Sequence, residues 1–121
     1  MYLPQFHEFE ENNRWWGKGF TEWTCVNHAK SLTSGHVIKK PHSDIGYYCL
    51  LNKNIRKKQA EMAKEFNIYG FCYYHYWFKG KKLLERPIEM MLENKDVKIP
   101  YCLSWANHKW TRIWDGDVDE L

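Results

Sequence analysis

The sequence predicts an α/β fold in which two helices connect three parallel strands in a βαβαβ order. The run Ile68–Phe78 is apolar or aromatic at nearly every position, which is typical of a strand buried on both faces. Apolar residues at helical spacing occur before and after this run. Two further apolar segments, Met1–Phe6 and Ile99–Trp105, are expected to be the first and last strands. Crossovers of this length join parallel strands through right-handed units.

The first half of the chain is expected to contain a short strand, a long connection and a helix. Met1–Phe6 is interpreted as a strand that Pro4 keeps short. A connection without sustained periodicity follows from His7 to Tyr48, with a possible short helix at Phe20–Lys30.

A helix is predicted from Asn52 or Asn54, either of which can cap it, to about Phe66. Asn67 suits a left-handed helix stop. The spacing of apolar residues gives this helix one buried face, made of Ile55, Met62, Ala63 and Phe66.

The second half is expected to contain a strand, a helix and a strand. Gly70, in the first strand, would allow another segment to approach the backbone closely. Pro87 stands near the first turn of the helix, and Ile99–Trp105 follows as a third buried strand. The apolar face predicted for the helix consists of Leu84, Ile88, Met91 and Leu92.

Composition and charge narrow the classes of function. The formal net charge is only +3 and the lysines are dispersed, which argues against a nucleic-acid-binding protein. No apolar stretch reaches the roughly 20 residues of a membrane span, and no leader opens the chain, so we expect a cytoplasmic protein. The four cysteines form no CxxC pair, and no cofactor is expected.

Aromatic residues make up 17% of the chain, and the seven tryptophans follow the predicted ends of strands. In parallel α/β folds, functional residues lie at the C-terminal edge of the strands. Tryptophan faces suit the C–H faces of a sugar ring, and polar side chains between them suit its hydroxyls. The candidates are the tryptophans Trp23, Trp77 and Trp105 and the polar residues Gln5, Glu22, His75, Asn107, Arg112 and Asp115.

Glu22 is the candidate catalytic carboxylate. It stands between Phe20 and Trp23, where loss of water would raise its pKa toward a value useful for acid–base catalysis. A helix-terminal acid that interacts with the helix dipole is an equally good interpretation of the spacing. A zinc site built from His7, His75 and His108 is a weaker alternative, because the sequence has neither HxH nor HExxH, and we expect no metal.

Five motifs are similar to those of the glycoside hydrolase family 99-like domain, also called the WbsX-type family, which occurs in gene clusters for bacterial polysaccharides and O-antigens. The resemblance covers nearly the whole chain, and the motifs follow in the family's order. They are YLPQFH at Tyr2–His7, NNRWWGKGFTEWT at Asn12–Thr24, YGFCYYHYWF at Tyr69–Phe78, LLERP at Leu83–Pro87 and WANHKWTRIWDG at Trp105–Gly116.

The resemblance implies a (β/α)₈ barrel, of which residues 1–121 would be the N-terminal βαβαβ part, and an activity on glycosidic bonds by transfer or hydrolysis. The substrate would be a glycan or a nucleotide sugar. A barrel of this kind takes about 250 residues, so the missing part of the barrel, or a second copy, is an expected partner. The resemblance adds His7 and Tyr76 to the sugar-binding residues. It also implies that catalytic carboxylates lie on later strands.

The chain departs from the family pattern at His108, where the motif usually has Glu, and at Lys109, where it usually has Asn. A histidine can still act as an acid or base near neutral pH, but it cannot form a glycosyl ester. His108 is therefore included among the sugar-binding candidates. A carbohydrate-binding remnant without catalysis remains the alternative function, and the segment alone is expected to be inactive.

Overall fold

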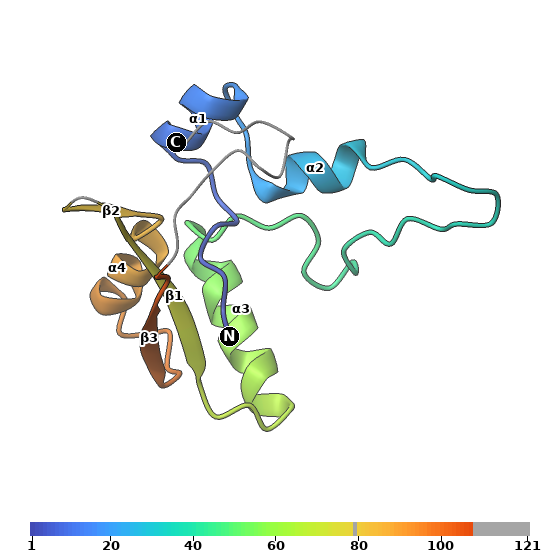
Figure 1. Cartoon of the computed structure of the whole chain (residues 1–121). Helices are drawn as coiled ribbons and strands as arrows, with labels where there is room; N and C mark the ends of the chain where they lie inside the picture. The colour runs from blue at the N-terminus through green and yellow to red at the C-terminus, as the bar shows by residue number, and fades with distance from the viewer. Residues whose placement is uncertain (79, 108–121) are drawn as a thin grey trace.

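The structure, a computed structural model, describes residues 1–78 and 80–107 as an α/β arrangement around a three-stranded sheet with the order β2–β1–β3. The strands are β1 (Phe71–Phe78), β2 (Lys81–Leu83) and β3 (Tyr101–Trp105). The helices are α1 (Glu10–Trp16), α2 (Glu22–His28), α3 (Lys53–Glu65) and α4 (Arg86–Glu93). Figure 1 shows β1 between α3 and α4, and α1 and α2 beyond the C-terminal end of β1.

The parallel pairing predicted for the two long strands is confirmed. β1 and β3 run in register from Phe71 opposite Tyr101 to His75 opposite Trp105, and α4 lies in the crossover between them. The close approach expected at Gly70 is also present. A Cβ atom built on Gly70 would lie 2.5 Å from the carbonyl oxygen of Pro100, which accepts a hydrogen bond from the Phe71 N–H at 2.9 Å.

The prediction that all strands are parallel is wrong, because β2 pairs with β1 antiparallel, with Tyr76 opposite Leu83. The sheet is therefore mixed, and within the described residues it is open rather than closed into a barrel. A tight hairpin connects the two strands, and Gly80, at φ 84°, supplies the left-handed conformation that such a turn requires. The strand has only three residues, two of them exposed lysines, so no hydrophobic pattern marks it.

The N-terminal segment is not the strand predicted over Met1–Phe6. It makes a single parallel bridge, Tyr2 opposite Tyr73. The Tyr2 N–H donates to the Cys72 carbonyl at 2.7 Å, and the Tyr74 N–H donates to the Tyr2 carbonyl at 3.2 Å. Pro4, which has no N–H to continue the ladder, lies buried in a turn directly afterwards.

The helix predicted after Asn52 is confirmed as α3. The Asn52 side chain accepts a hydrogen bond from the Asn54 N–H at 2.9 Å, which caps the helix. Asn67 follows the helix at φ 58°, the left-handed conformation expected of it.

The buried face of α3 differs from the predicted one. Arg56, Ala60 and Ala63 are buried, whereas Phe66 is 70% exposed. The pattern missed this face because it contains an arginine. The Arg56 guanidinium donates to the Leu50 carbonyl from one nitrogen, and its Nε and Nη2 have no partner within the described residues.

The second predicted helix is confirmed as α4, with Pro87 in its first turn. Ile88 and Met91 are buried as expected. Leu92 is exposed, contrary to prediction, and Leu84 is buried just before the helix in a left-handed conformation at φ 57°.

Two clusters form the hydrophobic core. The first joins α3 and α4 to one face of the sheet and is composed of Ala60, Ala63, Tyr73, Ile88, Met91, Val97 and Ile99. The second lies at the C-terminal end of β1 and is composed of Tyr76, Leu83, Leu84 and Ala106. The expectation that β3 is a buried strand is wrong, since all its residues except Ser104 are exposed.

The long connection contains two helices rather than one. α2 confirms the short helix expected within Phe20–Lys30, but α1 was not predicted. Two sequence signals could have revealed α1: acidic residues at its start, Glu10 and Glu11, and the i, i+4 spacing of Glu10 and Arg14. In the structure Glu10 and Arg14 form an ion pair at 2.8 Å. Among the described residues, none of the helices has the length and apolar character needed to cross a bilayer.

We expect Gly70→Ala to lower the free energy of unfolding by about 1–3 kcal/mol, because the added methyl group would overlap a backbone oxygen that cannot move independently. Urea denaturation of the purified protein measures this change. The neighbouring Tyr69→Ala is the control, because Tyr69 is 87% exposed and its loss should change stability by less than about 0.5 kcal/mol. Equal effects from the two variants would contradict the close approach.

Candidate functional site

Three predicted site residues converge at the C-terminal end of β1, and they come from three separate segments. Gln5 belongs to the N-terminal segment, Glu22 is the first residue of α2, and Tyr76 lies in β1. The Tyr76 hydroxyl donates to Gln5 Oε1 at 3.1 Å. The side chain of Gln5 also hydrogen-bonds Glu22. These three residues are called the Gln5–Glu22–Tyr76 cluster below.

The start of α2 fixes the position of Glu22. The Thr24 hydroxyl oxygen accepts a hydrogen bond from the Thr21 N–H at 3.1 Å, which closes the first turn around Glu22. Both interpretations of Glu22 made from the sequence therefore meet in one place, since Glu22 is a first-turn acid and also lies in a half-buried position.

Burial raises the pKa of Glu22 above its ordinary value of 4.5, and the hydrogen bond from Gln5 opposes this shift. An ionised carboxylate only accepts hydrogen bonds, so the Gln5 amide N–H₂ group is the donor to Glu22. The Gln5 oxygen is already used by Tyr76. Gln5 is thus held at both ends of its amide.

Tyr76 is buried, and burial is the main reason that its pKa rises to about 12, with smaller contributions from Tyr74 and from the charge of Glu22. The phenol is therefore neutral near pH 7 and remains a hydrogen-bond donor. The cluster combines a carboxyl group whose pKa is raised with a fixed amide and a neutral phenol, which is a suitable arrangement for moving a proton at Glu22.

Trp23, a predicted sugar-binding residue, has a structural role in the described chain. Its indole N–H donates to the Tyr48 carbonyl at 2.8 Å. Its ring centroid lies 4.7 Å from that of Phe6 and 5.1 Å from that of Tyr48. Trp23 therefore anchors the long connection beside the cluster.

His75, Trp77 and Trp105 lie on the opposite face of the sheet from Tyr76. Successive residues of a strand point to opposite faces, and register partners in a parallel pair point to the same face. His75 and Trp77 make an edge contact with ring centroids 6.0 Å apart, and His75 is the register partner of Trp105, which is 66% exposed. The structure thus separates these three residues from the Gln5–Glu22–Tyr76 cluster.

The tryptophans were expected to lie in loops at a single edge of the sheet, and this expectation is wrong for three of them. Trp15 and Trp16 lie in α1, and Trp23 lies in α2. Asn107 is exposed after β3. Three predicted site residues lie outside the described residues, namely His108, Arg112 and Asp115. The difference from the family motif at His108 therefore falls outside them too.

His7 is buried, with 2% of its surface exposed, and its Nδ1 atom has no hydrogen-bond partner within the described residues. It lines a cavity with six charged residues, none of which the sequence pattern indicated as a site residue. They were missed because the cavity forms between α1 and β2, neither of which was predicted. Within the described residues, no group of three or more His, Cys, Asp or Glu side chains is placed to hold a metal ion.

Comparison with known proteins gives one family and two relatives. The family model described as "Glycosyltransferase WbsX" matches residues 1–121. Proteins named "Uncharacterized protein WxcX" from two strains of Xanthomonas campestris pv. campestris, B100 and ATCC 33913, are each 46% identical over 116 residues, or 96% of this chain. The matched segment spans only 17% of the length of these relatives. No solved structure matches the chain.

We expect Trp23→Phe to destabilise the protein by about 1–2 kcal/mol, because the Tyr48 carbonyl loses its donor and the ring cluster loses volume. Urea denaturation followed by circular dichroism measures this loss. Trp77→Phe is the matched control and should change stability by less than about 0.5 kcal/mol, because the Trp77 side chain is exposed. A larger loss from Trp77→Phe would contradict the structural role of Trp23.

We expect the Glu22 carboxyl group to titrate above its ordinary value of 4.5, because burial disfavours its charged form. Gln5→Leu should raise the pKa further, because the variant removes the donor that stabilises the carboxylate. The measurement is a ¹³C NMR titration of the side-chain carboxyl, assigned with Glu22→Gln. Tyr69→Phe, a distant and exposed change, should leave the midpoint in place. A fall in the Glu22 pKa in Gln5→Leu would show that the hydrogen bond is not made.

Proposed function

The chain belongs to the Glycosyltransferase WbsX family, and on this premise we propose that the protein acts on glycosidic bonds during the biosynthesis of a bacterial cell-surface polysaccharide such as an O-antigen. Its substrate is a glycan or a sugar donor, and the reaction is transfer to another sugar or hydrolysis. The observation that carries the proposal is the convergence of Gln5, Glu22 and Tyr76 from three segments.

Glu22 is the proposed proton donor. Breaking a glycosidic bond requires a proton for the leaving oxygen and a carboxylate that stabilises the sugar cation. The carboxyl proton of Glu22 passes to the leaving oxygen as the bond from that oxygen to the anomeric carbon breaks. The hydroxyl that then attacks the anomeric carbon returns a proton to the Glu22 carboxylate. The raised pKa favours the protonated form that begins this cycle.

Gln5 and Tyr76 position Glu22 and complete the site. The Gln5 amide holds the carboxylate that forms when Glu22 loses its proton, and the Tyr76 hydroxyl fixes the Gln5 amide. The second carboxylate of the reaction comes from outside the described residues in this proposal.

We further propose that residues 1–121 form the first part of a (β/α)₈ barrel. Leu103 and Trp105 of β3 are exposed, and among the described residues no strand pairs with the outer edge of β3. A further strand and helix would cover both features. The small share of the relatives' length that the match covers is compatible with a longer domain.

Carbohydrate binding without catalysis is the second candidate function. The observation that favours it is the exposed aromatic face of Trp77 and Trp105, which lies apart from Glu22. In that case the aromatic residues would matter for function and the carboxyl group would not.

We expect Glu22→Gln to reduce polysaccharide formation by about 10²-fold or more, because the amide cannot donate a proton to the leaving oxygen. The measurement is incorporation of labelled sugar into polysaccharide by extracts of a strain that lacks the gene, supplemented with purified protein. Glu61→Gln makes the same chemical change on the exposed surface of α3 and should restore full incorporation.

Full restoration by Glu22→Gln would rule out the proposed proton donor. Full restoration by Glu22→Gln combined with loss in Trp105→Phe would instead support the binding function.

A further inference from the structure

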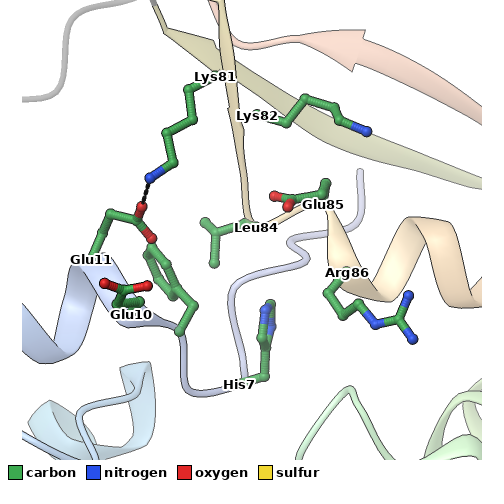
Figure 2. A pocket seen from close by; sticks show the side chains of 9 residues that line it. His7, Glu10, Glu11, Lys81, Lys82, Leu84, Glu85 and Arg86 are labelled. Carbon is green, nitrogen blue, oxygen red and sulfur yellow. Dashed lines mark hydrogen bonds and ion pairs between the residues drawn. The ribbon is translucent and has the colours of Figure 1, made fainter.

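A cavity of about 280 Å³ lies between the N-terminal segment, α1, β2 and the start of α4. Its lining includes Leu84 and Phe9, which pack in the same core cluster as Tyr76, but none of Gln5, Glu22 and Tyr76 lines it. We call this cavity the His7 pocket. Its walls are His7, Phe9, Glu10, Glu11, Lys81, Lys82, Leu84, Glu85 and Arg86. Figure 2 shows the ring of His7 pointing into the middle of this group, with Glu10 and Glu11 on one side and Glu85 and Arg86 on the other.

The charges of the His7 pocket balance, because three carboxylates face three cations. Each cation is already held by a carboxylate. Lys81 pairs with Glu11. Lys82 Nζ lies 2.8 Å from Glu89 Oε1, and Arg86 Nη1 lies 2.9 Å from Glu93 Oε1. An anion would therefore have to compete with existing ion pairs, and a metal cation would find no cluster of ligands within the described residues.

His7 contributes a buried polar atom that the described protein leaves without a partner. Burial lowers its pKa, so the imidazole is neutral near pH 7, although a hydrogen bond to the Pro4 backbone opposes the shift. Nδ1 itself is buried and has no hydrogen-bond partner within the described residues. A buried polar atom without a partner costs free energy, and a ligand hydroxyl, which can both donate and accept, would remove this cost.

The rest of the lining suits a sugar ring. A hydroxyl group both donates and accepts, so it can stand between the carboxylate of Glu85 and an ammonium group of a lysine without breaking an ion pair. Phe9 and Leu84 supply apolar surface for the C–H face of the ring. The volume lies just below the usual range for small-ligand pockets, about 300–1,000 Å³, and suits a ligand no larger than one sugar unit.

We propose that the His7 pocket is a subsite for one neutral sugar unit, whose hydroxyls bond to His7 Nδ1 and to Glu85 and whose C–H face lies on Phe9 and Leu84. The proposal rests on the proposed function and extends it, because it gives the glycan a second point of attachment outside the Gln5–Glu22–Tyr76 cluster. It also assigns the ligand class, since the balanced charges favour neutral sugars over uronic acids and phosphates.

Binding of methyl α-mannoside, methyl α-rhamnoside and methyl β-galactoside to the purified protein tests the proposal, with glucuronate and inorganic phosphate as charged comparisons. Saturation-transfer NMR detects binding, and titration gives the affinity. We expect at least one neutral glycoside to bind and neither anion to bind more tightly. Failure of all three neutral glycosides to bind, or tighter binding of an anion, would overturn the proposal.

Variants locate the binding. Glu85→Gln should weaken the neutral glycoside about tenfold, because a charged acceptor becomes a neutral one, whereas Glu61→Gln on α3 should have no effect. His7→Leu should weaken it about fivefold, and His7→Asn should restore part of the loss. The polar atoms of the Asn amide lie as many bonds from the backbone as Nδ1 does, so they return a hydrogen-bonding group. Unchanged affinity in both Glu85→Gln and His7→Leu would overturn the proposal.

Glu22→Gln separates this proposal from the proposed function. We expect it to reduce polysaccharide formation by about 10²-fold or more and to leave glycoside binding in the His7 pocket unchanged. If only Glu22→Gln weakens the glycoside, the pocket is not the subsite, while the proposed function stands. If Glu85→Gln weakens the glycoside but Glu22→Gln restores full polysaccharide formation, the subsite stands and the proposed proton donor is wrong.

Discussion

The single parallel bridge between Tyr2 and Tyr73 is the constraint on which the rest of the site depends. Two backbone hydrogen bonds attach the N-terminal segment to β1, and the Tyr2 ring packs on Phe71 and Tyr73 with centroids 4.7 and 4.5 Å away. Gln5 lies three residues after the bridge and His7 five residues after it. The side-chain contact between Gln5 and Tyr76 and the burial of His7 therefore both require this attachment.

Helix α3 supports the same segment from its other side. Gln59 accepts a hydrogen bond from the Tyr2 hydroxyl, and Arg56 donates to the Leu50 carbonyl. The Leu50 N–H donates in turn to the Phe6 carbonyl at 2.9 Å. The buried face of α3 carries Arg56 because the end of the long connection needs a donor there. Burying a charge without a carboxylate partner among the described residues is expensive, so this residue serves position rather than stability.

The sequence was sufficient for the elements that local rules control. Asn52, one of the two residues expected to cap the helix, caps α3, Pro87 lies in the first turn of α4, and Gly70 allows Pro100 to approach β1. It failed where tertiary contacts decide the outcome. β2 is a short strand because a hairpin pairs Lys81–Leu83 with β1, and the pattern of its own residues contains no strand signal.

The same division explains the candidate site. Gln5, Glu22 and Tyr76 could be selected because each is a polar group next to aromatic residues near an expected strand end or helix start. The face on which each side chain lies depends on register, which the sequence could not give for Trp77 and Trp105. The His7 pocket could not be foreseen, because its charged walls come from α1, β2 and the start of α4, and charged residues there resemble an ordinary solvated surface.

The aromatic residues near the Gln5–Glu22–Tyr76 cluster both position its backbone and raise the pKa of Glu22. Phe6 and Trp23 pack together and with Tyr48, and each directly follows a residue of the cluster, Gln5 or Glu22. Packing of the rings therefore fixes the backbone from which Gln5 and Glu22 extend. The half-burial that accompanies this packing is also the main cause of the raised pKa of Glu22. An aromatic side chain here need not touch a sugar to matter for its chemistry, because it sets both the position and the proton affinity of the carboxyl group.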